Sequence, residues 1–315
     1  MNPNRAAPLD QHSTPEQIAE QEIDRAIGAL LGLAVGDALG TTIEFCARDT
    51  RPHHTEMVGG GAFRLQAGQW TDDTAMALAL ADSLLASDAF DPADLMRRFV
   101  DWWRKGAYSC TGSCFDIGTT TRAALARFEK TADPFSGSKD ETQAGNGSLM
   151  RLAPVALFAY PDNANAVELA RSQSRTPHAA PQAVDACGFF AQLLAEAIAG
   201  AHRGVLKPRS WPGHRAVAAV AEGNWRTKSR DGISSKGYVV STLEAALWCV
   251  GNTENFEDAL ILAVNLGDDA DTVGAVTGQL AGALYGASAI PRRWLEPLAW
   301  RERIAGTARA LFRAE

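Results

Sequence analysis

The sequence predicts an all-α fold, and three observations support this prediction. Apolar residues recur at spacings of three and four through most of the chain, as they do on the buried face of a helix. Strand patterns are sparse, and the short candidates at residues 56–65 fit a hairpin or a loop better than a sheet. The chain has 315 residues and is 46% hydrophobic, which is ample for a sizeable core. We therefore expect a compact domain of orthogonally packed helices.

The apolar period predicts the helices in chain order. Residues 1–22 are polar, contain proline and show no period, so we expect a flexible arm before a domain that spans residues 23–315. The first helix is expected to begin at Ile23, and its apolar face continues to Leu39. Further helices are predicted at residues 74–86, 93–104, 119–128, 182–200, 238–250, 256–265 and 272–286. Loops are expected at the polar stretches 47–69, 129–147 and 203–235.

Two of these helices carry glycine at every fourth position. The first has Gly28, Gly32, Gly36 and Gly40, and the last has Gly274, Gly278, Gly282 and Gly286. Glycine inside a helix costs about 0.5–1 kcal/mol relative to alanine, so we expect the close approach of a neighbouring helix to compensate for it. If these two helices pack against each other antiparallel, Asp37 and Glu44 at the end of the first meet Asp269 at the start of the last.

Composition and charge argue against several classes of protein. No apolar run reaches the roughly 18 residues of a membrane helix and no signal peptide is visible, so we expect a cytoplasmic protein without a membrane partner. The formal net charge is -7 and no block of Lys and Arg occurs, which argues against nucleic-acid binding. The five cysteines are scattered without a C-x-x-C pair, so neither a disulfide framework nor a zinc knuckle is predicted.

Two acidic clusters stand where predicted helices begin. The first consists of Thr71, Asp72 and Asp73, and the second consists of Asp269, Asp271 and Thr272. Each cluster taken alone is explained as a helix cap, because carboxylates at a helix start interact with its unpaired N–H groups and its dipole. Two caps this rich in acid are less easily explained in that way.

A shared metal centre is the alternative interpretation of the two clusters. If the glycine rows bring the two helix starts together, four aspartates lie close to one another. Their mutual repulsion then favours protonation of some carboxylates unless cations balance the negative charge. Two divalent cations would balance it, and the threonine hydroxyls would complete the ligand set. All these ligands are hard oxygens, which favour magnesium, manganese or calcium over zinc or copper. The sequence therefore predicts a central site for two divalent cations.

Several segments resemble the signature stretches of the ADP-ribosylglycohydrolases, especially the bacterial dinitrogenase-reductase-activating type. They are GALLGLAVGDALGTTIEF, GGGAFRLQAGQWTDDTAM, CFDIGTTTRAAL, GNGSLMRLAPVAL, KGYVVSTLEAALW and NLGDDADTVGAVTGQLAGALYG, and they follow one another in the family's order. The resemblance implies an all-α fold and a centre of two divalent cations, Mg²⁺ or Mn²⁺. It also implies an ADP-ribosylated protein substrate, from which the enzyme removes ADP-ribose linked to arginine.

The resemblance also implies roles for individual residues. The family's metal-binding Thr-Asp-Asp and Asp-x-Asp-Thr correspond to Thr71, Asp72 and Asp73, and to Asp269, Asp271 and Thr272. Glu44 matches a family carboxylate that contacts the metal region or acts in catalysis, the alternative being a solvated helix end. Asp116 matches a family acid near the scissile sugar, so the acid–base role is open between Asp116 and Glu44. Asp37 is either an acceptor behind the metal ligands or a structural residue.

A further set of residues is expected to bind the ADP-ribose. In the family, the residues at the positions of Asn146, Gly147 and Ser148 line the ADP-ribose pocket, and many members have a histidine at the position of His178. The turn Gly59, Gly60 and Gly61 offers backbone N–H groups that could approach phosphate. The alternatives are a flexible turn for the three glycines and a structural role for the histidine.

Three alternatives to an arginine-specific hydrolase are left open by the sequence. The linkage could instead be to serine, a nucleobase or an acetyl group, because the loops 47–69 and 203–235 are expected to set specificity. The chain could be a non-catalytic binder of ADP-ribose or a crystallin-like structural relative, although its six metal-ligand candidates are complete. It could also be an immunity protein that reverses and sterically blocks an ADP-ribosylating toxin through residues 1–22, which by default are a disordered tail.

Overall fold

The computed structural model describes residues 14–87 and 89–313, and these residues form helices joined by loops, without a strand. The α-helices are α1 (Pro15–Gly40), α2 (Asp72–Ser87), α3 (Pro92–Lys105), α4 (Thr119–Thr131), α5 (Gly147–Met150), α6 (Ala153–Phe158), α7 (Asn163–Ser174), α8 (Pro181–Ile198), α9 (Arg215–Ala221), α10 (Val239–Gly251), α11 (Phe256–Val264), α12 (Ala270–Tyr285), α13 (Arg292–Leu295) and α14 (Arg301–Phe312). Short 3-10 turns are η1 (Glu141–Gln143), η2 (His202–Leu206), η3 (Asn224–Thr227), η4 (Arg230–Gly232) and η5 (Ala287–Ala289). The predicted all-α fold is confirmed.

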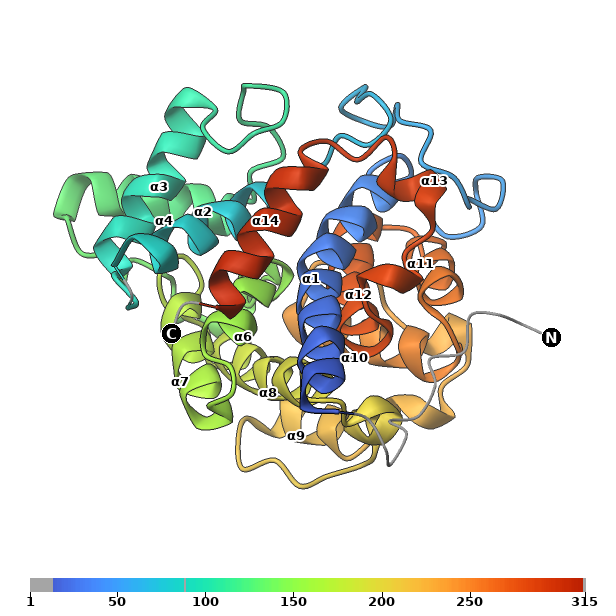
Figure 1. Ribbon diagram of the computed structural model, residues 1–315. Coiled ribbons are helices and arrows are strands. Elements are labelled where there is room, and N and C mark those ends of the chain that lie inside the picture. The colour runs from blue at the N-terminus through green and yellow to red at the C-terminus, as the bar shows by residue number, and fades with distance from the viewer. Residues whose placement is uncertain (1–13, 88, 314–315) are drawn as a thin grey trace.

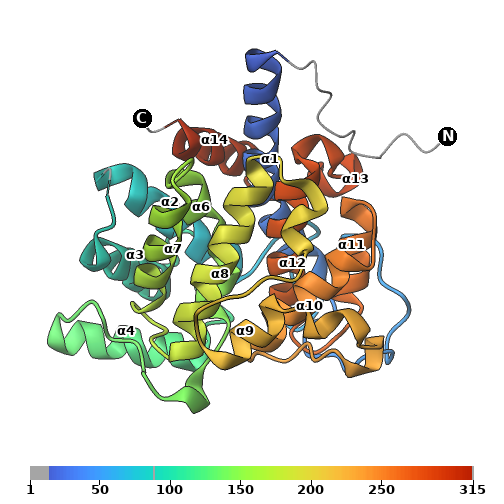
Figure 2. The same ribbon diagram turned by 90° about the horizontal axis from the view of Figure 1, so that it is seen from below.

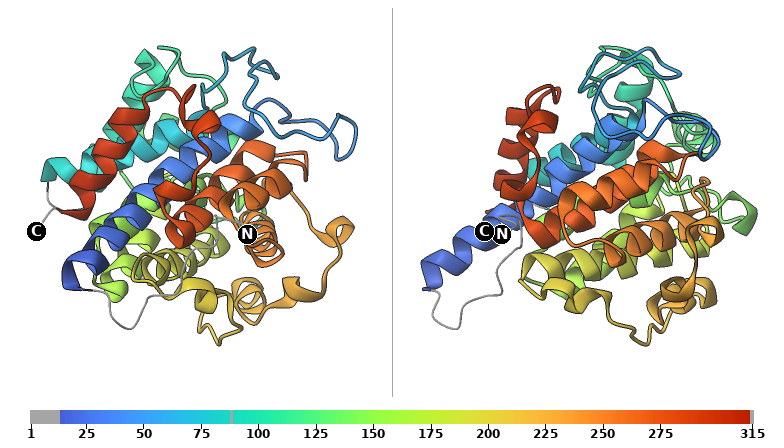
Figure 3. Two further views of the ribbon diagram at one scale, coloured as in Figure 1. Left: turned by 45° about the vertical axis from the view of Figure 1, so that its right-hand side comes forward. Right: turned by 90° about the vertical axis from the view of Figure 1, so that its right-hand side faces the viewer.

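The centre of the molecule is the antiparallel pair of α1 and α12, which lie side by side in Figure 3. The two glycine rows face each other along this contact. A Cβ atom added to Gly32 would lie 2.1 Å from the carbonyl oxygen of Gly278, and one added to Gly36 would lie 2.1 Å from that of Gly274. Backbone atoms cannot give way to a side chain at such distances, so only glycine allows the contact. The close antiparallel packing expected from the glycine spacing is confirmed.

The N-terminal end of α1 differs from the prediction, because the helix begins at Pro15 and not at Ile23. Thr14 Oγ1 accepts a hydrogen bond from the Gln17 N–H at 3.3 Å, and the Gln17 side chain accepts one from the Thr14 N–H at 2.9 Å. This capping box starts the helix although the first turns are exposed and therefore show no apolar period. Figure 2 shows this end of α1 projecting from the other helices. The rest of the predicted arm, residues 1–13, lies outside the described residues.

The remaining helices surround the central pair. Helices α8, α10 and α11 pack against α12, and α14 lies against α1 and α2 (Figure 1). The predicted loop 203–235 contains α9 as well as 3-10 turns, and the predicted loop 129–147 contains the end of α4 and η1. The 3-10 turns and the end of α4 are short, and α9, although rich in alanine and valine, has only 7 residues, so none of these segments shows a clear apolar period. Within the described residues, no helix combines the length and the apolar character that crossing a membrane requires.

Candidate metal centre and its cavity

Three helix ends meet at one place in the fold: the C-terminal end of α1 and the N-terminal ends of α2 and α12. The packing of α1 on α12 places Gly40 directly against Ala270. Thr71, immediately before α2, donates hydrogen bonds to Asp37 of α1 and to Asp271 of α12. The two acidic clusters, which are almost 200 residues apart in the chain, are therefore brought together.

Asp37 fixes α2 against α1, because both of its carboxylate oxygens are occupied. Its Oδ1 accepts from the N–H and the hydroxyl of Thr71 at 2.8 and 2.9 Å. Its Oδ2 accepts from the N–H and the hydroxyl of Thr74 at 3.0 and 2.6 Å. Burial raises the pKa of Asp37, and these bonds oppose that rise. The arrangement supports the role of an acceptor behind the metal ligands.

Asp73 and Asp271 form the core of the cluster. One carboxylate oxygen from each of Asp37, Asp73 and Asp271 lies within 4.8 Å of the other two. Thr71 Oγ1 lies 3.3 Å from an oxygen of Asp73 and 3.3 Å from an oxygen of Asp271, and Thr272 Oγ1 lies 3.5 Å from Asp73. Four of the six predicted metal ligands are thus in direct contact.

The cluster has buried oxygens that no protein group satisfies. Asp73 Oδ1, Asp271 Oδ1 and Glu44 Oε2 have no hydrogen-bond partner among the described residues. Burial raises the pKa of Asp72, Asp73 and Asp271 well above the usual range of aspartate, and the neighbouring carboxylates raise it further. Carboxylates in this arrangement need protons or cations to offset their charge. Their hard oxygens suit a divalent cation that prefers oxygen ligands.

Asp269 also belongs to this centre, and helix capping does not explain it. It is the N-cap residue of α12, yet its side chain makes no capping hydrogen bond. Its Oδ2 instead accepts from Asn146 Nδ2 at 2.7 Å, and the same amide donates to Thr242 Oγ1 at 2.9 Å. The Asp269 N–H donates to the Ser235 carbonyl at 3.0 Å. Contacts from two other parts of the chain therefore hold this carboxylate in place.

Glu44 and Asp116 lie close to Asp271. One carboxyl oxygen from each of the three residues lies within 4.8 Å of the other two. Burial raises the pKa of Glu44 to about 9, and the charge of Asp116 adds to the rise. Burial likewise raises the pKa of Asp116 to about 8, with the charge of Asp37 adding to it. Glu44 is 5% exposed, so the alternative of a solvated helix end is wrong.

A cavity of about 280 Å³ lies beside this cluster. Its wall contains most of the residues that the sequence analysis selected: Glu44, Asp72, Asp116, Asn146, Gly147, His178, Asp269, Asp271 and Thr272. Thr71 and Asp73 are not in the wall, but each contacts a wall residue. Thr71 donates a hydrogen bond to Asp271, and Asp73 accepts one from Thr272. The predicted catalytic and metal-binding residues therefore form one site with part of the predicted substrate-binding set.

Ser148 does not reach this cavity. It is fully buried in α5, and its hydroxyl lies 2.9 Å from Ser174 Oγ and 3.3 Å from Cys187 Sγ. The neighbouring His178 does reach it, and its ring packs where a Cβ atom on Gly147 would lie, 2.6 Å from His178 Cε1. Burial lowers the pKa of His178 to about 3, so its imidazole is neutral at physiological pH.

The glycine turn also lies outside the cavity wall. Gly59, Gly60 and Gly61 all have positive φ angles and form a tight loop after α1. The Gly60 N–H donates to the Leu65 carbonyl at 2.7 Å, so it is not free to bind phosphate. A direct phosphate contact from this turn is therefore not supported, because the loop folds back on itself.

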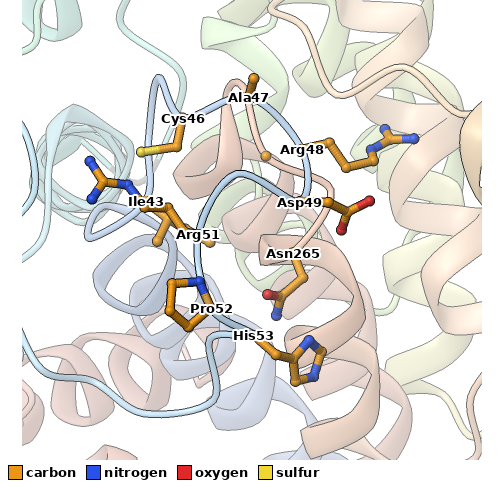
Figure 4. Close-up of a pocket in the computed structure, with 10 residues that line it drawn as sticks. Ile43, Cys46, Ala47, Arg48, Asp49, Arg51, Pro52, His53 and Asn265 are labelled. Carbon is orange, nitrogen blue, oxygen red and sulfur yellow. The ribbon is translucent and has the colours of Figure 1, made fainter.

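Hydrogen bonds tie the loop after α1 to the loop before α12. The Phe45 N–H donates to the Asp268 carbonyl at 2.7 Å, next to Asp269. The Arg48 guanidinium donates to the carbonyls of Leu266 at 2.9 Å, Arg230 at 2.5 Å and Ile233 at 2.6 Å. Figure 4 shows this loop around a smaller pocket of about 120 Å³, with the side chains of Arg48 and Arg51 pointing in opposite directions.

Several residues of the cavity wall were not predicted. They are Phe45, Gly118, Thr119, Thr120, Thr121, Gly145, Met150 and Gly237. The threonines begin α4 just after Asp116, and Gly237 shortly precedes α10. These residues lie next to predicted site residues or at predicted helix starts, and this position in the sequence could have indicated them.

An all-helical domain with a carboxyl pair beside a cluster of hard-oxygen ligands defines a class of hydrolases suited to divalent cations. Within that class, the chain belongs to the ADP-ribosylglycohydrolase family, whose family model matches residues 18–315. The resemblance of the signature segments is thereby confirmed, and the protein is a hydrolase by family.

Similar proteins and a solved structure agree with this assignment. The chain is 49% identical over 294 residues to the ADP-ribosylarginine hydrolase Tri1 of Pseudomonas putida (strain GB-1), covering 93% of this chain and 79% of that protein. It is 37% identical over 282 residues to the ADP-ribosyl-[dinitrogen reductase] glycohydrolase of Rhodospirillum rubrum, covering 87% and 90%. A solved structure described as an ADP-ribosylglycohydrolase-related protein complex matches with a TM-score of 0.83 and 46% identity, covering 94% of this chain and 99% of that one.

Proposed function

We propose that this protein hydrolyses the N-glycosidic bond between ADP-ribose and the guanidine group of a modified arginine in a protein substrate. The observation that carries the proposal is the carboxyl pair Glu44 and Asp116 in a cavity that lies against buried aspartates whose carboxylate oxygens lack hydrogen-bond partners. Two similar bacterial proteins, 49% and 45% identical to this chain, bear the name ADP-ribosylarginine hydrolase, which supports arginine as the linkage.

The proposal includes two divalent cations, Mg²⁺ or Mn²⁺, in the cluster. The residues that would hold them are Thr71, Asp72, Asp73, Asp269, Asp271 and Thr272. When bound, such cations would orient the ribose hydroxyls and polarise the attacking water. The unsatisfied Asp73 and Asp271 oxygens and the hard-oxygen character of the set support this fit.

The chain's own residues supply binding and proton transfer. Asn146, Gly147 and His178 form the part of the wall expected to hold the ADP-ribose. In the reaction, the anomeric carbon gains a bond to water oxygen and loses its bond to nitrogen, and the nitrogen keeps the electron pair. One carboxylate of the pair, Glu44 or Asp116, accepts the proton of the water, and a carboxyl group of the same pair donates a proton to the departing guanidine nitrogen. The raised pKa values of the pair are typical of such groups.

The test compares linkages directly. Peptides carrying ADP-ribose on arginine or on serine, and ADP-ribosylated DNA, are incubated with the protein, with and without Mn²⁺, and free ADP-ribose is measured. We expect release from the arginine-linked peptide and only with the cation. Release from another substrate alone would replace arginine by that linkage, and binding of ADP-ribose without release from any substrate would make the protein a binder.

We also propose a second role, the blocking of an ADP-ribosyltransferase toxin by the N-terminal end. The exposed first turns of α1 project from the other helices, which leaves them free to enter a partner's cleft. A solved structure similar to this chain is described as a protein complex. The test measures binding of the full chain, and of the chain without residues 1–20, to an arginine-specific ADP-ribosyltransferase. Equal binding by both would reject this role.

A further inference from the structure

Phe45 is an exposed phenylalanine in the cavity wall, next to the carboxyl pair. Its side chain is 65% exposed, more than any other large apolar side chain among the described residues. It lines the cavity and follows Glu44 directly in the chain. A single exposed apolar side chain is common on protein surfaces, so the informative observation is the position of this ring in the cavity wall beside the carboxyl pair.

Backbone and aromatic contacts restrain Phe45. Its backbone has a φ of 62°, and its N–H is bound to the Asp268 carbonyl at 2.7 Å. The Phe63 ring lies edge-on to it, with ring centroids 6.1 Å apart, and the Phe115 ring lies 5.1 Å from Phe63. The three phenylalanines form a continuous aromatic ledge, which we call the Phe45 ledge.

The glycine turn explains how Phe63 reaches this ledge. A Cβ atom on Gly61 would lie 2.4 Å from the Thr41 carbonyl, and one on Gly59 would lie 2.6 Å from the Leu65 carbonyl. Only glycine therefore lets the loop close on itself and against the end of α1. The turn was expected to contact phosphate, but it instead places Phe63 against Phe45, which lines the cavity.

Carboxyl groups flank the two ends of this ledge. Glu44 directly precedes Phe45 and Asp116 directly follows Phe115, and both carboxyl groups line the cavity. A guanidinium group is planar and permanently charged, and it stacks on aromatic faces. The ledge therefore suits the planar face of a guanidinium group, and the adjacent carboxyl oxygens suit its N–H donors.

We infer that the Phe45 ledge receives the guanidinium group of the ADP-ribosylated arginine and selects this linkage over serine or ester linkages. The inference rests on the proposed function. The carboxyl pair must stand at the bond that breaks, and Phe45 is its immediate neighbour on the exposed side, from which a side chain on a protein substrate has to enter. A serine-linked or ester-linked ADP-ribose carries no planar cation at this position, so it forms no cation–π contact with the Phe45 ring.

The experiment separates the arginine from the ADP-ribose. The variants Phe45→Ala, Phe45→Leu and Phe45→Tyr are compared with the wild type in the presence of Mn²⁺. One measurement is the KM for an arginine-linked ADP-ribosyl peptide, and the other is the Kd for free ADP-ribose by calorimetry. Phe135→Leu is the matched control, because Phe135 is 47% exposed and lies outside the cavity wall.

We expect Phe45→Ala to raise the KM about tenfold, as the loss of a partly desolvated cation–π contact would. Phe45→Leu should shift it in the same direction, whereas Phe45→Tyr and Phe135→Leu should leave it unchanged. The Kd for ADP-ribose should change less than twofold in every variant. Because the side chain is exposed, the melting temperatures should also match the wild type.

Two results would overturn the inference. An equal loss in KM and in ADP-ribose Kd would show that the ring binds the ADP-ribose itself, and unchanged values for Phe45→Ala and Phe45→Leu would show that it binds neither. Failure of the wild type to release ADP-ribose from the arginine-linked peptide is a separate result, since it would reject the proposed function and not merely the role of the ring.

Discussion

Asp271 connects the two chemical parts of the site. Its carboxylate belongs to the group with Asp37 and Asp73 and also to the group with Glu44 and Asp116. It is 1% exposed, and its Oδ1 has no hydrogen-bond partner among the described residues. The side chain therefore links the proposed metal ligands to the proposed acid–base pair.

Replacing Asp271 should remove cation binding and turnover together. Loss of groups that merely support a metal ligand costs about 10–100-fold in affinity, so we expect Asp271→Asn to weaken Mn²⁺ binding at least 100-fold. Calorimetric titration with Mn²⁺ and an assay of ADP-ribose release measure the two effects. Asp231→Asn, at an exposed aspartate, is the control and should behave as wild type. Full activity of Asp271→Asn would refute the metal assignment.

Among the helices, the contact between α1 and α12 positions the whole site. It brings Asp37 and Glu44 from one helix end to Asp269 and Asp271 at the other. Because the contact is made by backbone atoms, it leaves no room for a side chain and little freedom for the helices to slide. The positions of the proposed metal ligands are therefore set in part by glycines several turns away from them.

Alanine at Gly278 should destabilise the protein by at least about 3 kcal/mol, because the new methyl group would lie 2.0 Å from the Gly32 carbonyl oxygen. The matched control is Gly306→Ala in α14, where an added Cβ meets no atom within 4 Å. That variant should be stabilised by about 0.5–1 kcal/mol through higher helix propensity. Urea unfolding measures both. Equal stabilities of the two variants would contradict the backbone contact.

Arg48 should stabilise both the fold and the metal centre. Its guanidinium donates hydrogen bonds to three carbonyls. The Leu266 carbonyl lies in the loop before Asp269, and the Ile233 carbonyl lies two residues before Ser235, which accepts a hydrogen bond from the Asp269 N–H. Arg48→Met leaves the Ile233 carbonyl without a donor and removes one of two donors from the carbonyls of Leu266 and Arg230, so we expect a loss of about 3 kcal/mol in unfolding free energy. We also expect about tenfold weaker Mn²⁺ binding. Arg51→Met, in the same loop but exposed, should change neither property. A loss of stability without any change in Mn²⁺ affinity would limit Arg48 to a structural role.

The sequence predicted the parts of this molecule that rest on repeated or chemically distinctive residues. Glycine at every fourth position has few explanations other than close helix packing, and the structure confirms it at Gly32 and Gly278. Aspartate and threonine at two helix starts indicated a cluster, and Thr71 does reach Asp271. Both patterns are local in sequence, which is why they could be recognised there.

The remainder depends on contacts between distant segments. The wall residue Phe45 has no periodic pattern around it, and its position follows from loop contacts such as that of Arg48 with Leu266, 218 residues away. Helix α9 is short, with little more than Val217 and Val220 to bury, so it was expected to be a loop. The exposed first turns of α1 carried a capping box but no apolar face, and the cap was overlooked.

For the molecule as a whole, the buried carboxyl groups connect stability to pH. The pKa of Glu44 rises from 4.5 to about 9 on folding, and that of Asp116 rises from 3.8 to about 8. At a pH between the unfolded and the folded pKa of either group, the folded protein binds more protons than the unfolded chain. The unfolding free energy must therefore fall as the pH rises through this range.

Metal-free protein should melt several degrees lower at about pH 9 than at about pH 6, and saturating Mg²⁺ should reduce the difference. The reason is that bound cations keep the carboxylates ionised in the folded state. Thermal unfolding with a chelator or with Mg²⁺ measures both slopes. The double variant Glu44→Gln and Asp116→Asn should flatten the slope of the metal-free protein. A metal-free protein that becomes more stable towards pH 9 would contradict these pKa shifts.

The glycine contact also has a consequence for protein synthesis. The two partners of the central contact are α1, which the ribosome makes first, and α12, which it makes near the end. Residues 41–269 separate them, and at common translation rates these take roughly 10 to 50 s to make. Throughout that interval the glycine face of α1 has no partner of its own chain. The centre of this protein is therefore assembled last, and its first helix must stay unpaired without aggregating until then.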